Sequence, residues 1–280
     1  MLSSRVRARY PERIVCLTEE TTETLYLLGE ERRIVGISGY TVRPARARRE
    51  KPRVSAFLSA RIDRILELKP DLVLGFSDLQ ADIARELAKA GLNIMIFNQR
   101  SVDEILSMIL TLASMLGAAE KGLRLVASLE QGLEEMRAAA SCFPRRPKVY
   151  FEEWDEPMIS GIRWVSELVE IAGGQDIFSE LSTSQAASGR IVADASLVVQ
   201  RQPEVILASW CGKKFRPERV LARPGWSAIP AVRNNQLFEI KSADILQPGP
   251  AALTDGVRRI HEILRDFLSR GGRTLRSGDA

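Results

Sequence analysis

The longest helical pattern in the sequence lies near its middle and constrains the fold most. Between residues 118 and 140 there is no proline, and apolar side chains such as Leu123, Val126 and Leu129 recur on one helical stripe. At 1.5 Å per residue this helix is roughly 35 Å long, about the width of a small lobe. The prolines of the segment Cys142–Pro147 end it. We therefore expect one long helix that joins two folding units.

Short apolar runs alternate with amphipathic stretches on both sides of that helix. This alternation is typical of an α/β protein whose sheets are largely parallel. Glycine or proline directly after an amphipathic stretch marks the predicted helix ends. Strands are predicted at 14–17, 34–37, 72–74, 94–97, 148–151, 205–208 and 237–240, and helices at 21–28, 60–68, 80–90, 101–140 (interrupted at Gly117), 164–172, 195–201 and 251–269.

The two halves of the sequence echo each other. The segment Ile65–Phe76 (ILELKPDLVLGF) reads like Val198–Ser209 (VVQRQPEVILAS): a helix end, a proline, an acidic residue and a buried strand. Pro70 and Pro203 are 133 positions apart, close to the 134 positions between the opening strands at Val15 and Val149. Near-equal offsets predict two Rossmann-like α/β lobes. The predicted division is a first lobe at 1–117, the joining helix at 118–141, a second lobe at 142–270 and a disordered tail at 271–280.

Composition and charge are ordinary for a globular protein. The chain has 280 residues, a net charge of +4 and 45% hydrophobic residues. Its basic residues cluster in Thr41–Arg53, where only Glu50 offsets six cations. A solvated loop is the simplest interpretation, and contact with an anionic ligand is the alternative. A nucleic-acid partner for this loop is a third interpretation, but the mild net charge does not imply one, and we expect none.

Cysteine usage and hydropathy bear on location. Cys16, Cys142 and Cys211 show no paired spacing, and free thiols fit a reducing compartment. No run approaches the ~20 apolar residues of a membrane span, and the first residues lack the apolar core of a signal peptide. As the sequence stands we expect a soluble, cytoplasmic protein without membrane insertion. If a leader was removed, a periplasmic or lipid-anchored location is expected instead.

Ligands of parallel α/β sheets gather outside the carboxyl ends of the strands. Two lobes facing each other would therefore bring the loops that follow their strands around one cleft. Aromatic residues recur in or near these loops, where core packing is less expected than within a strand, and we predict that they bind a ligand. These aromatic residues are Tyr40, Phe57, Phe76, Trp154 and Trp210.

Acidic residues are dense in two of the same loops. The segment Phe151–Pro157 (FEEWDEP) places four carboxylates around one indole, and such charges repel unless solvent, a cation or a ligand separates them. A catalytic acid pair, a metal cluster and one wall of a ligand cleft are the three interpretations. Together with the aromatic residues, the predicted ligand-binding set is Glu19, Glu20, Tyr40, Phe57, Phe76, Glu153, Trp154, Asp155, Glu156, Ser160, Trp210 and Asp244.

Signals for catalysis are weak. The single histidine, His261, lies on an apparent C-terminal helix, where a packing role is expected. No nucleophile elbow or glycine-rich phosphate loop follows a strand, and the His and Cys ligands of a tight zinc or haem site are absent. We therefore expect no enzyme and no required cofactor. The alternative is a metal-ion-dependent enzyme or scaffold that uses Glu19, Glu20, Glu152, Glu153, Asp155 and Glu156.

Five segments carry a family resemblance that extends from about residue 14 to residue 268. They are VCLTEETTETLYLLGEERRIVGISGYTVRP, RIDRILELKPDLVLG, MISGIRWVSELVEIAGGQDIF, RQPEVILAS and RPGWSAIPAVRNNQLFEI. With these segments the chain resembles the periplasmic-binding-protein-like family with a helical backbone. That family includes the cobalamin-binding and ferric-siderophore-binding components of ABC importers. The resemblance implies two α/β lobes, a stiff helix between them and a ligand in the cleft.

The resemblance is nearer to the cobalamin-binding branch, whose aromatic residues at the positions of Tyr40, Phe57 and Phe76 are similar in kind and help to hold the corrin face. It implies a cobalamin-like corrinoid or another small-molecule metal chelate as the ligand. A ferric siderophore is the alternative, with Arg163 and Arg190 as cationic arms.

The sequence departs from the family at three places. The glutamates with which family members dock on the ABC permease fall near Ala81 and Ser196, although Asp82 and Asp194 are close by. A permease partner is therefore not evident from these positions. As the sequence stands, a leader peptide is not expected either. In the loop after the first strand, Glu19 or Glu20 replaces the proline that is usual in the family.

The acidic segment itself has a predicted geometry. Trp154 should face the ligand, with Glu153, Asp155 and Glu156 at the rim of the site. Not all the acids can point inward together, because successive residues of an extended segment alternate faces. Glu152, which adjoins the strand, should bind backbone amides or Arg163.

Overall fold

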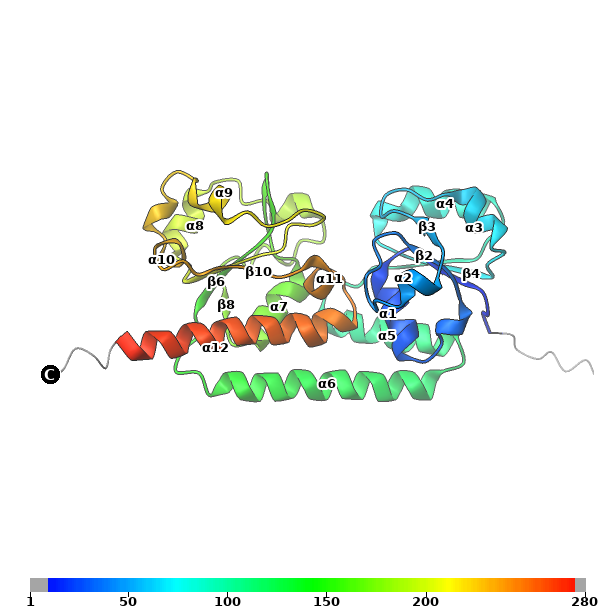
Figure 1. Ribbon diagram of the computed structural model, residues 1–280, viewed down its shortest axis with the longest axis horizontal. Helices are drawn as coiled ribbons and strands as arrows, with labels where there is room; N and C mark the ends of the chain where they lie inside the picture. Colours follow the sequence, from blue (N-terminus) through cyan, green and yellow to red (C-terminus); the bar gives the residue numbers. More distant parts are fainter. Residues whose placement is uncertain (1–9, 275–280) are drawn as a thin grey trace, which may run out of the picture. The chain divides into compact units, whose positions relative to one another are not determined.

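The computed structural model describes residues 10–274, with side chains described up to residue 270. The chain divides into two compact units. The N-terminal unit holds the residues up to Gln99 together with Leu106–Ala127, and the C-terminal unit holds Arg100–Ile105 and the residues from Ser128 onward. Each unit is built around its own sheet, as the alternating pattern predicts (Figure 1).

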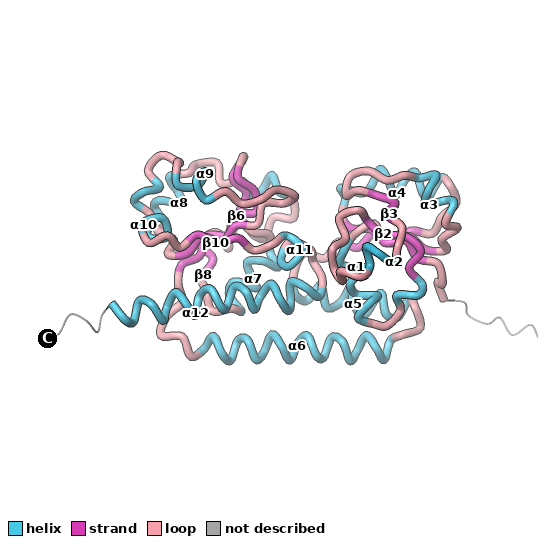
Figure 2. Tube along the Cα trace, in the orientation of Figure 1, coloured by secondary structure: helices cyan, strands magenta, loops and turns pink. Residues whose placement is uncertain are grey.

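The sheet of the N-terminal unit is fully parallel, with the strand order β3-β2-β1-β4-β5. Its strands are β1 (Ile14–Cys16), β2 (Ile34–Ser38), β3 (Arg53–Ser55), β4 (Leu72–Phe76) and β5 (Ile94–Phe97). Its helices are α1 (Glu19–Leu27), α2 (Ala47–Glu50), α3 (Ile62–Glu67) and α4 (Ala81–Lys89), with 3-10 turns η1 (Glu31–Arg33) and η2 (Asp78–Gln80). Helices lie on both faces of this sheet (Figure 2), which is why β1 and β4 are wholly buried. On one face Val15, Val54 and Val73 pack against Ile65 of α3 and Leu87 of α4.

The sheet of the C-terminal unit is mixed and centres on β6 (Lys148–Asp155). The other strands are β7 (Met158–Ser160), β8 (Gln175–Asp176), β9 (Val205–Ala208) and β10 (Leu237–Glu239). β9 pairs with β6 in parallel and with β10, while β7 pairs with the end of β6 in antiparallel and β8 with its beginning in parallel. The hairpin of β6 and β7 makes this sheet differ from its N-terminal counterpart.

Helices cover both faces of the second sheet as well (Figure 1). They are α7 (Arg163–Ile171), α8 (Ser196–Arg201), α9 (Pro217–Leu221), α10 (Pro230–Arg233), α11 (Ser242–Ile245) and α12 (Val257–Thr274), with short turns at Ala187–Arg190 and Trp226–Ala228 and a π-helical turn at Ala252–Gly256. On one face a core forms around Tyr150 and Ile206 with Val198, Val220 and Trp226.

Two long helices lie between the sheets in sequence, α5 (Val102–Met115) and α6 (Ala119–Ser141). Gly117 separates them with a φ of +71°, which favours glycine. Residues of α6 belong to both units, which confirms the predicted long helix. A Cβ added at Gly122 would lie 2.5 Å from that of Ala113, so glycine allows α5 and α6 to approach closely.

The echo between the halves corresponds to one repeated arrangement. In each unit a helix ends in a left-handed residue, Lys69 (φ 45°) or Gln202 (φ 51°), and proline follows. The chain then enters a buried strand, β4 after Pro70 and β9 after Pro203. Both strands pair in parallel with the opening strand of their own unit. The similar sequences therefore build the same part of each sheet.

Two predicted boundaries are wrong by more than two residues. β6 extends to Asp155, beyond the predicted 148–151, because its charged end pairs with β7. Residues 271–274 of the predicted disordered tail are helical, as the end of α12, and 275–280 lie outside the described residues. His261 packs in the C-terminal unit as expected, with Nδ1 3.1 Å from the carbonyl oxygen of Ala172 and its ring stacked on Phe143.

Candidate functional site

Four apolar side chains occupy loops at the carboxyl ends of strands in the N-terminal unit. Tyr40 follows β2, Leu58 follows β3 and Leu79 follows β4, and their exposed fractions are 62%, 68% and 60%. Phe57, next to Leu58, is half-buried. The carboxyl ends of neighbouring parallel strands meet at one edge of a sheet, so these loops share that edge. We call Tyr40, Phe57, Leu58 and Leu79 the apolar platform.

Gln80 ties two loops of the platform together. Its buried side chain donates from Nε2 to the carbonyl oxygen of Phe57 at 3.0 Å, and its Oε1 accepts from the backbone N–H of Phe76 at 3.0 Å. Phe76 itself is buried at the end of β4. The structure thus places this predicted ligand contact in the core beside the platform, because both faces of β4 are covered.

Glu19 and Glu20 begin α1 directly after β1, and both are buried. Glu19 Oε2 accepts from the N–H of Val42 at 2.9 Å, two residues beyond Tyr40, and Glu20 Oε1 accepts from the hydroxyl of Thr18 at 2.5 Å. Within the described residues the second oxygen of each carboxyl has no hydrogen-bond partner. Burial raises the pKa of Glu19 to about 8 and that of Glu20 to about 7. Burial thus favours the protonated form of both carboxyls, and Glu19 anchors the loop of Tyr40.

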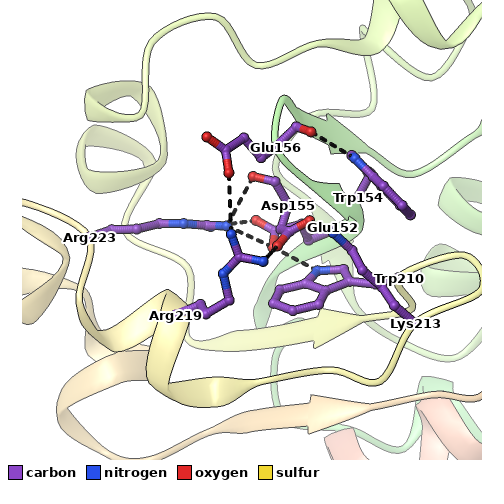
Figure 3. A network of polar contacts seen from close by, with 8 residues as sticks. All are labelled: Glu152, Trp154, Asp155, Glu156, Trp210, Lys213, Arg219 and Arg223. Carbon is purple, nitrogen blue, oxygen red and sulfur yellow. Dashed lines mark hydrogen bonds and ion pairs between the residues drawn. The ribbon is translucent and has the colours of Figure 1, made fainter.

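The acidic segment of the C-terminal unit is neutralised by cations from distant parts of the chain (Figure 3). The fully buried carboxylate of Glu152 accepts from Arg223 at 2.5 and 3.0 Å and from the indole Nε1 of Trp210 at 3.0 Å. Its partner is thus Arg223, and the prediction of Arg163 is wrong. Arg163 instead pairs with Glu167 at 2.9 Å.

Asp155 contacts two further cations. Its carboxylate binds the ammonium group of Lys213 and lies 2.6 Å from Arg219. Burial acts to raise the pKa of Asp155, but the hydrogen bond and charge of Lys213, helped by Arg219, outweigh burial and lower it. Glu156 is exposed and lies 3.2 Å from Arg219.

Trp154 lies half-buried at the end of β6. Its Nε1 donates to the carbonyl oxygen of Glu156 at 2.8 Å, and the ammonium group of Lys213 stands 3.9 Å from its ring centroid (Figure 3). The indole is therefore fixed by the turn and carries a cation on its face.

Trp210 differs from Trp154, although both were predicted to contact the ligand. Its exposed fraction is 2%, and its ring packs edge-on against Phe215 with centroids 5.1 Å apart. The structure places Trp210 in the core because the buried carboxylate of Glu152 accepts its N–H. Ser160 is also buried, with its hydroxyl donating to the carbonyl oxygen of Arg190. Neither side chain is accessible to a ligand in this structure.

Glu153 forms a paired ion bridge with Arg190, at 2.6 and 3.1 Å. The guanidinium also donates to the carbonyl oxygen of Ser160, and Arg190 is 2% exposed. In the alternative interpretation of a ferric-siderophore ligand, Arg190 is a candidate cationic arm. The structure makes Arg190 a buried partner of Glu153 instead.

Asp244 lies half-buried in α11, after β10. The indole Nε1 of Trp164 donates to the carbonyl oxygen of Ile245 at 2.9 Å and fixes this turn. The carbonyl group of Asp244 packs so closely on Gly256 of the π-helical turn that a Cβ there would overlap it. The two turns therefore position each other.

The sequence pattern does not identify Leu58, Leu79, Gln80 or Arg223. Leu58 and Leu79 stand beside predicted loops, and an apolar residue in a strand-end loop was the available signal.

Within residues 10–274, no cluster of three or more His, Cys, Asp or Glu side chains has the geometry to hold a metal ion. In the same range no helix has the length and apolar character needed to cross a membrane.

Comparison with known sequences gives related proteins over most of the chain. A vitamin B12-binding protein of Vibrio cholerae is 28% identical over 265 residues, covering 91% of this chain and 89% of that protein. An uncharacterized ABC transporter substrate-binding lipoprotein of Bacillus subtilis, YvrC, is 23% identical over 261 residues, covering 90% and 79%.

Solved structures share the fold. The periplasmic vitamin B12 binding protein of Vibrio cholerae aligns with a TM-score of 0.71 at 25% identity, covering 92% of this chain and 98% of that one. The periplasmic heme-binding protein RhuT of Roseiflexus aligns with a TM-score of 0.73 at 25% identity, covering 90% and 99%. The family model described as periplasmic binding protein matches residues 14–243. This chain belongs to the periplasmic binding protein family.

Proposed function

We propose that this protein is the substrate-binding component of an ABC importer and that it binds a flat metal chelate, in the first place a cobalamin-like corrinoid. The observation that carries the proposal is the apolar platform at the carboxyl edge of the N-terminal sheet. The 28% identity to a vitamin B12-binding protein supports it independently. The role is binding and not catalysis.

The platform suits the face of a macrocycle. Burying apolar surface contributes roughly 25 cal/mol per Å², so a broad apolar face gains affinity in proportion to the area it covers. Tyr40, Leu58 and Leu79 offer that area because their side chains are exposed. In the C-terminal unit Trp154 is half-buried, and it remains a proposed ligand contact of that unit.

The alternatives lack comparable support. Arg190 is buried against Glu153, which removes one expected arm for a ferric siderophore. The acids of β6 are paired with arginine and lysine, which weakens a metal-ion site there. In the basic stretch Arg43 pairs with Glu23, which weakens a nucleic-acid surface.

The importer role also implies a permease and a location. We propose docking on an ABC permease and a place on the outer side of the membrane, which the kinship with a substrate-binding lipoprotein supports. Asp82 stands on α4 with its side chain 92% exposed, and Asp194 is held by Ser196 just before α8. These two carboxylates are the candidates for contacts with arginines of the permease.

Titration with cyanocobalamin, haemin and a ferric siderophore tests the proposal through visible absorbance and tryptophan quenching. We expect saturable binding of at least one chelate. The double variant Tyr40→Ser, Leu58→Ser should lose about tenfold or more in affinity, because it removes two apolar contacts. The matched control Leu27→Ser, Leu123→Ser removes two exposed apolar side chains elsewhere and should bind like the wild type. Equal losses in both variants would contradict the role of the platform.

A further inference from the structure

A cavity of about 600 Å³ opens in the N-terminal unit beside the apolar platform. Its lining comes from the end of β2 and from the turn that follows β3, and it includes Gly39 and Ala56. Gly39 directly precedes Tyr40 of the platform, and Ala56 directly precedes Phe57. The cavity and the platform are therefore adjacent, and one ligand can reach both.

Two arginines share this lining because of the pleat of β3 and the turn after it. Val54 points into the core, so its neighbour Arg53 faces the opposite side of the sheet. An antiparallel bridge between Ser55 and Ala60 then folds the chain back. It brings Arg61 beside Arg53, where its guanidinium donates to the Arg53 carbonyl oxygen at 2.5 Å.

The charges of this pair are not compensated. Among the described residues no carboxylate pairs with Arg53 or Arg61, and the lining of the cavity contains no acidic side chain. The neighbouring cations Arg43 and Arg46 in contrast pair with Glu23 and Glu31. A guanidinium group presents a planar set of donors that matches a carboxylate or a phosphate.

One further polar group at the cavity lacks a partner. The hydroxyl of Ser55, which lies on the same side of β3 as Arg53, is buried without a hydrogen bond to the described residues. Buried hydroxyls are usually satisfied, so this one is a candidate to bond a ligand group after a small side-chain rotation.

We propose that the cavity is a subsite for an anionic arm, a carboxylate or a phosphate, carried at the edge of the ligand whose flat body lies on the apolar platform. Arg53 and Arg61 bind the arm and thereby select among chelates of similar shape. This inference rests on the proposed function, because the platform must hold the body of the ligand.

Two pairs of probes test the subsite, and the members of each pair differ mainly in whether they carry an anionic arm. The two pairs together distinguish a phosphate arm from a carboxylate arm. Cobinamide phosphate and cobinamide test a phosphate, and haemin and its dimethyl ester test carboxylates. The variants are Arg53→Gln, whose guanidinium has no partner in the described structure to lose, and Arg53→Gln with Arg61→Gln. The control Arg48→Gln, Arg49→Gln removes the same net charge from exposed positions on α2.

We expect the wild type to bind the charged member of at least one pair about tenfold or more tightly than the neutral member. Arg53→Gln should reduce this preference and the double variant should abolish it, while affinity for the neutral member and the behaviour of the control stay unchanged. If the neutral member binds but charge gives no preference, or the double variant keeps the preference, the subsite is refuted and the proposed function stands. If no probe binds, both are refuted.

Discussion

At the scale of single residues, Trp154 and Trp210 differ in what they are expected to do. The indole of Trp154 is half-buried beneath Lys213, whereas that of Trp210 is buried with Glu152 and Phe215. Trp154→Ala should weaken chelate binding about tenfold and leave the melting temperature nearly unchanged, because it removes an accessible aromatic face. Titration of a protein shown to be folded by circular dichroism measures this. Unchanged affinity together with a large loss of stability would make Trp154 a core residue.

Trp210→Ala should instead cost about 3–5 kcal/mol in the free energy of unfolding, because it opens a cavity in the core and leaves Glu152 with one donor fewer. Urea denaturation measures the loss. Stability close to that of the wild type would contradict the placement of this indole.

The ion pairs in Figure 3 predict that substitutions of two arginines differ in their cost to the free energy of unfolding. Arg223→Met leaves the fully buried carboxylate of Glu152 without its charge partner, which should destabilise the protein by about 3–5 kcal/mol. Arg219→Met affects an arginine that is nearly half exposed and should cost under about 1 kcal/mol. Urea unfolding of the two variants makes the comparison, and similar losses would mean that burial does not set the strength of these pairs.

Glu19 predicts a pH dependence of stability. Its pKa rises from 4.5 to about 8 on folding, so the folded protein keeps a proton that the unfolded chain has released. The resulting stability is complete below about pH 4.5 and is lost as the pH rises toward about 8. Glu19→Gln should flatten this decline and, at pH 8, be more stable than the wild type by on the order of 1–2 kcal/mol. Urea titrations at several pH values, with the exposed Glu67→Gln as control, would refute this if Glu19→Gln kept the wild-type slope.

The residue scale is also where the sequence predicts least. Tyr40 and Trp154 are predicted ligand contacts because aromatic residues stand out near strand ends, and in the structure neither side chain is buried. The burial of Trp210 depends on Arg223, whose contact with Glu152 spans 71 positions and leaves no local signal. Likewise, the sequence of a basic stretch does not distinguish a solvated loop from a ligand subsite. That distinction depends on which arginines pair with a carboxylate, as Arg43 does and Arg53 does not among the described residues.

At the scale of elements, each repeat of helix, proline and strand contains a left-handed residue with a side chain. Replacing such a residue by glycine is expected to raise the stability of the protein. Lys69 adopts a left-handed conformation that costs a residue with a side chain roughly 1 kcal/mol and costs glycine little. Lys69→Gly should therefore raise the free energy of unfolding by up to about 1 kcal/mol. The control Arg64→Gly, inside α3, should lower it by a similar amount. Thermal and urea unfolding measure the stability of both variants. A Lys69→Gly variant less stable than the wild type would contradict the claim that the left-handed conformation strains Lys69.

Most elements follow from sequence because their signals are local. Gly29 and Gly91 end the helices α1 and α4, and Pro70 follows α3 closely, so these ends lie near their predicted positions. The predicted strand 148–151 is shorter than β6 because Glu152 and Asp155 are charged, and charged residues are not typical of a buried strand. Their burial depends on arginine and lysine from the loops after β9, which the local pattern does not include.

At the scale of the whole molecule, two α/β units and one long helix are the predicted architecture and the observed one. The sheet of each unit positions its loops, and the platform and its cavity belong to the N-terminal unit alone. Neither the repeat nor the helix specifies a ligand. The chemistry of the strand-end loops distinguishes a chelate-binding protein from others with the same fold.

Native mass spectrometry tests most directly whether the protein binds a flat metal chelate. The protein is mixed with cyanocobalamin, haemin and a ferric siderophore together, and the mass of each complex identifies what has bound. We predict one chelate per chain, retained in the wild type and reduced in the Tyr40→Ser, Leu58→Ser variant. Absence of every chelate adduct under conditions where the folded chain is observed would contradict the proposed function.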